Sequence, residues 1–221
     1  MNPADEIKNV WNILSVSEDS IWSIRALKPY GSTEHLPAVN WLFTPVQYPD
    51  VEDRKRAFER KALSLDRQGY NVYAVMNPIK SGFDGDAVSD NDIDRREVLL
   101  IDIDRSGDTK CPASDAEVQA AVELGAVVAD CILGEGFEEP LKVMSGNGVH
   151  LYCRLKNLPN DERSRAVIET VLKSLAEKFD NEAVRIDTAV FNASRITKVP
   201  GTTAKKGTES ADRPYRMARV I

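Results

Sequence analysis

The sequence predicts an α+β fold made of two units, and three observations support this prediction. Segments with apolar residues at helical spacing alternate along the chain with short runs of β-branched and aromatic residues. Residues 98–104 have the composition of a buried strand, and residues 161–179 have the spacing of a long amphipathic helix. Residues 79–94 are polar and rich in glycine, serine and aspartate, so we expect a loop there and a seam between the two units.

Each expected element follows from its local pattern of apolar and polar residues. In the first unit we expect a helix over 4–14, strands over 20–27 and 39–43, a helix over 52–67 and a strand over 71–76. In the second unit we expect a strand over 98–104, a helix over 114–131, strands over 141–145 and 149–155, a helix over 161–179 and a last short strand over 183–186. Ser114 and Glu117 have the spacing of a capping box, and Gly146-Asn147-Gly148 favours a hairpin turn.

The composition narrows the class of protein. The chain has 221 residues, of which 42% are hydrophobic, and no apolar run approaches the roughly 18–20 residues that cross a bilayer. The first residues lack the basic start and apolar core of a signal peptide. Three cysteines without paired spacing favour reduced thiols, and two histidines are too few for a multi-histidine metal site. We therefore expect a cytoplasmic protein with no membrane partner.

Charge is distributed unevenly along the chain, although the net charge is only −6. The segment 84–104 is rich in aspartate, whereas 195–221 holds seven basic residues against two acidic ones. The basic residues are Arg195, Lys198, Lys205, Lys206, Arg213, Arg216 and Arg219. This asymmetry predicts a polyanionic partner near the C-terminal end. The alternative is a solvated, partly disordered tail after Lys206.

Two carboxylates end the expected strand over 98–104. Side chains alternate faces along a strand, so Asp102 and Asp104 point the same way, with Cα atoms about 6.5–7 Å apart. Two like charges on one face favour a divalent cation between them, and oxygen ligands suit Mg²⁺ or Mn²⁺. The alternative is a solvated strand end that leads into the polar loop after Arg105.

The hairpin turn is a candidate phosphate site. Gly146 and Gly148 flank Asn147 and would leave backbone amides unobstructed, as in loops that cradle phosphate oxygens. His150 follows at the start of an apolar strand, where its imidazole could donate to an anion. The alternative is a tight turn followed by a histidine that belongs to the core.

A third acid and two cations follow in the last third of the chain. Asp187 stands at the end of the expected short strand, and Arg195 and Lys198 are spaced to hold one polyphosphate. An acid that completes a metal pair, together with cations for a triphosphate, suits nucleotidyl transfer. In that chemistry two metal ions activate a 3′-hydroxyl and stabilise the departing pyrophosphate.

The ordered motifs resemble a known family. Asp102-Ile-Asp104, Ser145-Gly-Asn-Gly-Val-His150 and Ile186-Asp187 resemble the three catalytic motifs of the archaeo-eukaryotic primase superfamily. The stretch Arg195–Thr202 is similar to the basic element that follows the third motif in plasmid, phage and mobile-element primase-polymerases. Ile24–Leu27 and Val72–Pro78 also resemble the first module of this group, so the resemblance covers roughly residues 20–202.

The resemblance implies a single primase-polymerase catalytic domain over 1–221. Its parts would be an αβ module over about 1–90, an RRM-like catalytic module over 91–202 and a basic C-terminal segment over 203–221, with the active-site cleft between the two modules. It would use NTPs or dNTPs on a single-stranded DNA template. Because no P-loop motif is present, unwinding would fall to a separate helicase or to a missing part of a longer protein.

The resemblance also implies roles for individual residues. Two Mg²⁺ or Mn²⁺ ions would be bound by Asp102, Asp104 and Asp187, and these acids would be catalytic together with His150. The incoming nucleotide would contact Ser145, Gly146, Asn147, Gly148, His150, Arg195 and Lys198. The template would contact Lys205 and Lys206.

Two other functions remain open, and the sequence departs from the family at one motif. A non-catalytic RRM-like nucleic-acid binder would expose aromatic residues on its sheet, whereas acids and a histidine stand here. A metal-dependent replication-initiator nuclease needs a histidine pair, and His35 lies far from His150 in sequence. Relatives often have an arginine after Asn77-Pro78, whereas Ile79-Lys80 follows in this chain.

Overall fold

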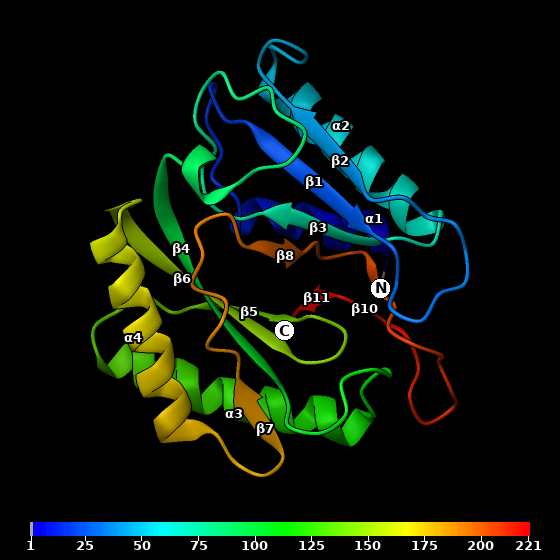
Figure 1. The fold of residues 1–221 in the computed structure, drawn as a ribbon, viewed down its shortest axis with the longest axis vertical. Coiled ribbons are helices and arrows are strands. Elements are labelled where there is room, and N and C mark those ends of the chain that lie inside the picture. Colours follow the sequence, from blue (N-terminus) through cyan, green and yellow to red (C-terminus); the bar gives the residue numbers. More distant parts are fainter. Residues whose placement is uncertain (1) are drawn as a thin grey trace.

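Two antiparallel sheets and a short ribbon form the framework of the molecule (Figure 1). The computed structural model describes residues 2–221, apart from the side chain of Asn157. The first sheet has the order β2 (Val39–Phe43), β1 (Trp22–Leu27), β3 (Asn71–Val75) and β8 (Ile196–Lys198). The second has the order β11 (Arg219–Val220), β5 (Leu141–Met144), β6 (Val149–Pro159), β4 (Arg95–Arg105) and β7 (Val184–Ile186). The ribbon pairs β9 (Thr203–Ala204) with β10 (Arg216–Met217).

Helices cover the outer faces of both sheets. The helix α2 (Val51–Arg67) packs on the first sheet, and α3 (Asp115–Gly134) and α4 (Glu162–Phe179) lie along one side of the second (Figure 1). A short 3₁₀ turn, η2 (Asp90–Asp92), interrupts the loop that joins the sheets. The expected capping box is confirmed, because Ser114 and Glu117 exchange hydrogen bonds at the start of α3.

The helix expected over 4–14 differs from its prediction. The structure has a single α-turn, α1 (Pro3–Glu6), that continues as a 3₁₀ helix, η1 (Ile7–Asn12). Long-range contacts anchor this segment: Glu6 Oε1 accepts a hydrogen bond of 2.6 Å from Val220 N, and Gly201 fits directly against the backbone of Ile7. Local spacing predicts a helical segment but carries no information about these distant contacts.

The strand β4 has one face packed in the apolar core and the other facing a cavity. Leu99 lies against the side chains of α3 and α4, and Ile101 and Ile103 on the same face are fully buried. Asp102 and Asp104 point to the opposite face and line a cavity between the two sheets. The period-two alternation of a strand therefore delivers the core residues to one side and both acids to the other, as predicted.

The two sheets are not contiguous in sequence. The chain crosses from the first sheet to the second in the loop 79–94, where the seam was expected. The strand β8, however, lies in the segment assigned to the catalytic module and pairs with β3 in the first sheet. The strand β11 lies in the expected C-terminal segment and pairs with β5 in the second. The predicted boundaries 91–202 and 203–221 therefore do not follow sheet membership, because backbone pairing between distant segments decides it.

Residues 183–186 are not the last strand, because four short strands follow β7. Each has only two or three residues, which is too short for an alternating apolar pattern to appear in the sequence.

Asn77 stabilises the seam between the two units. It is buried, and its side-chain amide donates to Ala193 O and accepts from Glu97 N and Val98 N.

No helix within residues 2–221 is both long enough and apolar enough to cross a membrane.

Candidate active site

A cavity of about 480 Å³ lies between the two sheets, and both sheets contribute to its walls. It brings together most of the residues that the sequence singled out: the three acids, the histidine, two residues of the hairpin and four basic residues. These are Asp102, Asp104, Asp187, His150, Ser145, Asn147, Arg195, Lys198, Lys205 and Lys206. Residues from 102 to 206 thus meet in one place, although they are widely separated in sequence.

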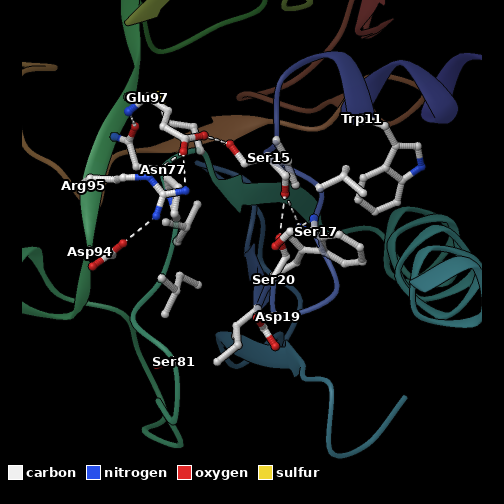
Figure 2. Close-up of a pocket in the computed structure, with 18 of the residues that line it drawn as sticks. Trp11, Ser15, Ser17, Asp19, Ser20, Asn77, Ser81, Asp94, Arg95 and Glu97 are labelled. Atoms are coloured by element: carbon white, nitrogen blue, oxygen red, sulfur yellow. Dashed lines mark hydrogen bonds and ion pairs between the residues drawn. The ribbon is translucent and has the colours of Figure 1, made fainter. Parts of the chain in front are cut away.

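A larger cavity of about 880 Å³ lies at the other end of β4 (Figure 2). Three of its charged residues are engaged with one another: Arg95 forms ion pairs with Asp94 and Glu97, and Glu97 also accepts a hydrogen bond from Ser15. None of the predicted site residues lines this cavity. The acids and cations of the smaller cavity therefore mark the better candidate for chemistry.

The two acids of β4 have opposite pKa shifts. Burial opposes the ionisation of Asp102, but His150, Arg195 and Lys206 outweigh it and hold the pKa of Asp102 below its ordinary value. Burial, together with the charge of Asp102, raises the pKa of Asp104 to about 6. Negative charge at Asp104 is therefore only partly compensated within the protein, and a cation bound there would compensate it.

Asp187 lies beside the other acids but has partners of its own. Its backbone N donates to Asp102 O at 2.8 Å, which places the end of β7 next to β4. Its carboxylate accepts from Ala189 N at 2.8 Å and lies 3.6 Å from the Arg195 guanidinium. Among the described residues, no group of three or more acids, histidines or cysteines is close enough together to form a ready-made metal centre.

The donor set nevertheless suits a hard divalent cation. Asp102 and Asp104 offer only oxygen ligands on one face of a strand, and their charge is incompletely balanced. Asp187 would have to leave Arg195 before it could join them. The three-acid metal set therefore stays a prediction, with Asp102 and Asp104 as its best-placed members.

His150 is both buried and placed in the candidate site. Its side chain contacts three groups: Nε2 lies 3.4 Å from Asp102 Oδ1, and Nδ1 lies 3.0 Å from the Tyr152 hydroxyl and 3.3 Å from Thr197 Oγ1. Tyr152 and Thr197 also share a hydrogen bond, so the imidazole connects an acid of the second sheet to β8 of the first. Burial raises the pKa of Tyr152, which keeps this hydroxyl neutral.

The glycines of the hairpin turn have a packing role. A Cβ at Gly148 would lie 2.2 Å from Ile103 O, and one at Gly146, whose φ is +106°, would lie 2.3 Å from the Cβ of Ala204. Neither glycine lines the cavity. The nucleotide contact predicted for these glycines therefore stays a prediction, and the role that the structure shows is close packing against β4 and β9. Ser145 and Asn147 line the cavity instead, and Asn147 Oδ1 also accepts from Ala113 N at 2.9 Å.

Arg195 and Lys198 both line the cavity, but they differ in exposure, in hydrogen-bond partners and in charge. Arg195 is one-third exposed and pairs with Asp187. Lys198 is 3% exposed and donates to Thr203 O at 2.7 Å. Burial lowers the pKa of Lys198 to about 7, so this amine is only partly charged at neutral pH until an anion binds nearby.

The pair Lys205 and Lys206 divides into two roles. Lys205 Nζ forms an ion pair with Asp66 at 2.8 Å and donates to Asp66 O and Tyr70 O, so it ties the C-terminal segment to the end of α2. Lys205 also lines the cavity, but internal acceptors occupy its ammonium, so the template contact at Lys205 stays a prediction. In the part of the chain that the structure describes, the Lys206 ammonium has no hydrogen-bond or ion-pair partner, and it lies in the field of Asp102 and Asp104.

Single substitutions at these two lysines should separate the roles. We expect Lys206→Ala to lower affinity for phosphate-bearing ligands and to reduce the log–log salt slope for single-stranded DNA by about 0.7 if the lost contact is to the template. Lys205→Ala should instead lower the melting temperature and leave the salt slope unchanged. Fluorescence anisotropy over a salt series, together with thermal denaturation of both variants, checks this. A changed salt slope in Lys205→Ala would return Lys205 to the template.

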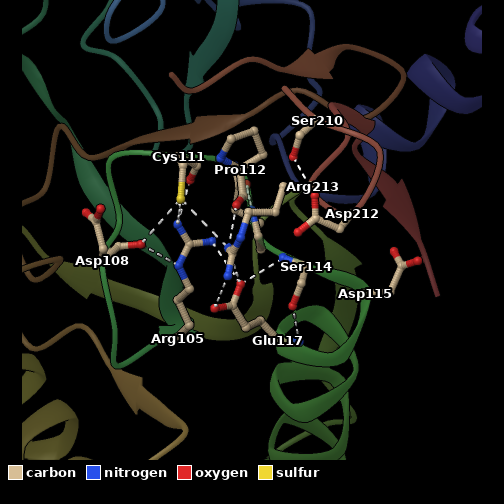
Figure 3. A network of polar contacts seen from close by, with 12 residues as sticks. Arg105, Asp108, Cys111, Pro112, Ser114, Asp115, Glu117, Ser210, Asp212 and Arg213 are labelled. Atoms are coloured by element: carbon tan, nitrogen blue, oxygen red, sulfur yellow. Dashed lines mark hydrogen bonds and ion pairs between the residues drawn. The ribbon is translucent and has the colours of Figure 1, made fainter. Parts of the chain in front are cut away.

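The C-terminal segment is folded, which contradicts the alternative of a solvated tail. Arg213 forms a double hydrogen bond with Glu117 at 2.7 and 3.1 Å (Figure 3). Arg216 pairs with Asp115 at 2.6 Å. Arg105, almost fully buried, also forms an ion pair with Glu117 at 3.5 Å and donates to Cys111 O. These contacts fasten the residues that follow Lys206 to the start of α3.

Replacing Glu117 with glutamine should loosen this attachment. Arg213 lowers the pKa of Glu117 to about 2, so the carboxylate stabilises the fold above its ordinary pKa near 4.5, and this contribution is lost as the pH falls toward 2. We expect a loss of roughly 1–3 kcal/mol at pH 7 that disappears at low pH. Denaturant unfolding at pH 7 and pH 3 measures it. An equal loss at both pH values would contradict the ion-pair explanation.

Comparisons with known proteins agree with this geometry at the level of the fold. The sequence matches no protein-family model and no curated protein. The structure is similar to the AEP domain of the primase-polymerase from cyanophage S-2L, with a TM-score of 0.53 and 16% identity, over 98% of this chain and 88% of that one. It is also similar to the polymerase domain of ligase D from Mycobacterium tuberculosis, solved in complex with DNA, with a TM-score of 0.52 and 14% identity, over 97% and 79% of the two chains. The chain has the archaeo-eukaryotic primase-polymerase fold.

In this primase-polymerase fold, one wall of the cavity comes from the first sheet, and the sequence did not predict which residues form it. Four polar residues from the first module line the cavity: Lys28, Tyr30, Asn71 and Tyr73. Tyr73 lies in the segment Val72–Pro78 that resembles the family's first module, which was the one available signal. The other three stand in no motif, because their place depends on how the two sheets meet.

Proposed function

We propose that this chain is a template-dependent nucleotidyltransferase, a DNA primase-polymerase that transfers a nucleoside monophosphate from an NTP or dNTP to a 3′-hydroxyl. One observation carries the proposal: the three motif acids line a single cavity together with Arg195, Lys198 and Lys206. Acids for metal ions and cations for a triphosphate are what this reaction requires at one place. The similarity to two polymerase domains, one of them in complex with DNA, supports the same class of reaction.

The basic residues of the cavity would bind the triphosphate, and its acids would bind metal ions. Arg195, Lys206 and the partly charged Lys198 would bind the triphosphate, and His150, which also lines the cavity, would add a further contact. Asp102, Asp104 and Asp187 would hold two Mg²⁺ or Mn²⁺ ions, which when bound activate the 3′-hydroxyl and stabilise the leaving pyrophosphate. The triphosphate would compete with Asp187 for Arg195 and so release that carboxylate toward the other acids.

The bonds that change are one P–O bond formed and one broken. The 3′-oxygen bonds to the α-phosphorus of the incoming nucleotide, the bond from that phosphorus to the pyrophosphate oxygen breaks, and the hydroxyl proton passes to water. Asp102 and Asp104 lie together on the face of the sheet that lines the cavity, and placing two like charges there is costly. A protein that only bound nucleic acid would not need this arrangement.

The test is incorporation of labelled nucleotide. The protein is incubated with primed and unprimed single-stranded templates, with NTPs or dNTPs, and with Mg²⁺, Mn²⁺ or EDTA. We expect products that require a template and a divalent cation and that are absent with Asp104→Asn. Binding of DNA without incorporation under any of these conditions would favour a non-catalytic nucleic-acid binder.

A further inference from the structure

A third cavity, of about 420 Å³, lies between the second sheet and the helices α3 and α4. It is on the opposite face of β4 from Asp102 and Asp104, because Leu99 lines it and side chains alternate faces along a strand. Its apolar walls are Leu99, Ile132, Phe137, Val171 and Leu175, and its polar ones include Glu135, Thr170 and Ser174. Cavities of roughly 300–1,000 Å³ with mostly apolar walls are typical sites for small ligands.

An amine and a thiol meet at this cavity, and both line it. Lys178 Nζ on α4 donates to Cys131 Sγ on α3 at 3.2 Å. The same ammonium lies 5.1 Å from the centre of the Phe179 ring, so two contacts define its position. In the described part of the chain no carboxylate forms an ion pair with Lys178, whereas Lys173 on the same helix pairs with Glu169 at 2.8 Å. The amine of Lys178 is therefore positioned by a thiol and not by an acid.

The two thiols that line the cavity differ in reactivity. Cys153 on β6 is only 1% exposed, and burial raises the pKa of its thiol to about 12, so it stays protonated. A buried thiol of this kind is inert, because the thiolate is the nucleophile. Cys131 is partly exposed, so a reagent can reach it. Cys131 is therefore the thiol of this cavity that can react, and Lys178 is the group beside it.

A thiol and an amine at this distance can divide one acyl transfer into two easier steps. A lysine amine is almost fully protonated near neutral pH, with an ordinary pKa of about 10.4, and reacts slowly with an acyl donor. A thiol is a far better nucleophile under the same conditions. Once an acyl group is on the Cys131 sulfur, attack by the Lys178 amine is intramolecular, which removes the entropic cost of bringing the reactants together.

We propose that Cys131 and Lys178 form an acyl-transfer site that accepts an acyl thioester, with the acyl chain in the apolar cavity. The Cys131 sulfur would bond to the thioester carbonyl carbon, the bond from that carbon to the donor sulfur would break, and the thiol proton would pass to the donor. The neutral Lys178 amine would then bond to the same carbon as the C–S bond to Cys131 breaks, and the amine proton would return to that sulfur. The product is an amide on Lys178, a restored Cys131 thiol and the donor as a free thiol.

This inference goes beyond the proposed function and does not depend on it, because the two cavities share no lining residue. The acylated lysine would lose its positive charge on α4, and the bound chain would contact Leu99 on β4.

The test incubates the full chain with octanoyl-coenzyme A or acetyl-coenzyme A in mildly alkaline buffer and measures acylation of each lysine by peptide mass spectrometry. Lys173 is the internal reference, because it is exposed on the same helix with a carboxylate, not a thiol, as its partner. Cys131→Ser removes the thiol step, and Lys178→Arg removes the acceptor. Circular dichroism establishes that both variants fold.

We expect wild-type Lys178 to be octanoylated about tenfold or more faster than Lys173, and faster by the octanoyl than by the acetyl donor. In Cys131→Ser the rate at Lys178 should fall to the rate at Lys173. In Lys178→Arg the octanoyl group should stay on Cys131 as a thioester that neutral hydroxylamine removes.

Three results would overturn the inference. Acylation of wild-type Lys178 no faster than that of Lys173 would show that no acyl-transfer site exists. An unchanged rate at Lys178 in Cys131→Ser would remove the thiol from the reaction. Equal rates with the two donors would show that the cavity does not bind the acyl chain. None of these results bears on the proposed function, which nucleotide incorporation tests separately.

Discussion

Replacing Asp104 with asparagine is expected to abolish nucleotide incorporation and to raise the melting temperature of the metal-free protein at neutral pH. The amide cannot supply the carboxylate charge that a bound cation needs, so activity should fall below detection. The stability gain has a separate cause, because burial and Asp102 raise the pKa of Asp104 to about 6. At pH 7 the folded protein therefore holds the Asp104 carboxylate ionised at a free-energy cost that the unfolded chain does not bear.

The sign and size of this gain depend on pH. A pKa raised from 3.8 to about 6 means that ionisation of Asp104 destabilises the fold progressively between those two values and fully above them. The cost is at most about 3 kcal/mol, equivalent to a gain of up to about 10 °C in the variant. Melting curves of wild type and Asp104→Asn in EDTA should diverge as the pH rises from 4 to 7. A constant difference across this range would contradict the assignment.

Asp102→Asn is the matched control on the same strand face. It should also abolish incorporation, but it should not stabilise the metal-free protein, because His150, Arg195 and Lys206 already favour the Asp102 carboxylate. Activity near that of wild type in either variant would show that these acids do not form the metal site. Equal stabilisation by both variants would show that simple charge repulsion, rather than the asymmetric surroundings of the two acids, governs the site.

Replacing His150 with alanine should weaken triphosphate binding by about 10- to 150-fold, with little change in template binding. A hydrogen bond to a charged partner contributes about 1.5–3 kcal/mol, and the proposed partner of this imidazole is phosphate. The substitution also removes the side chain that does most to lower the pKa of Asp102, so the pKa of Asp102 should rise. Titration with a fluorescent triphosphate and with labelled template measures the two affinities separately.

The control for His150 is Tyr152→Phe, which keeps the aromatic ring and removes the hydroxyl that lies 3.0 Å from His150 Nδ1. We expect a smaller loss of triphosphate affinity, because the imidazole would keep its contact with Asp102 while losing one of its anchors. Circular dichroism of both variants establishes that they fold. If His150→Ala unfolds while Tyr152→Phe binds triphosphate normally, His150 is a core histidine and the phosphate contact is wrong.

The sequence by itself determined the features of this protein that depend only on residues close together along the chain. The alternation of side chains along β4 is sufficient by itself to place Asp102 and Asp104 on one face. The capping box at Ser114 and the hairpin after Met144 likewise depend on neighbours within a few residues. The order of three motifs was sufficient to indicate the fold and the acids of the candidate site.

Tertiary structure decided what depends on contacts between distant segments. The strand β8 joins the first sheet because β3 offers it a free edge, although it follows β7 of the second sheet in sequence. Lys205 and Lys206 are adjacent and chemically identical and both line the cavity, yet Asp66 forms an ion pair with Lys205 and not with Lys206. The hairpin glycines fit closely against β4 and β9. In each case the deciding partner lies far away along the chain, and no local pattern records its position.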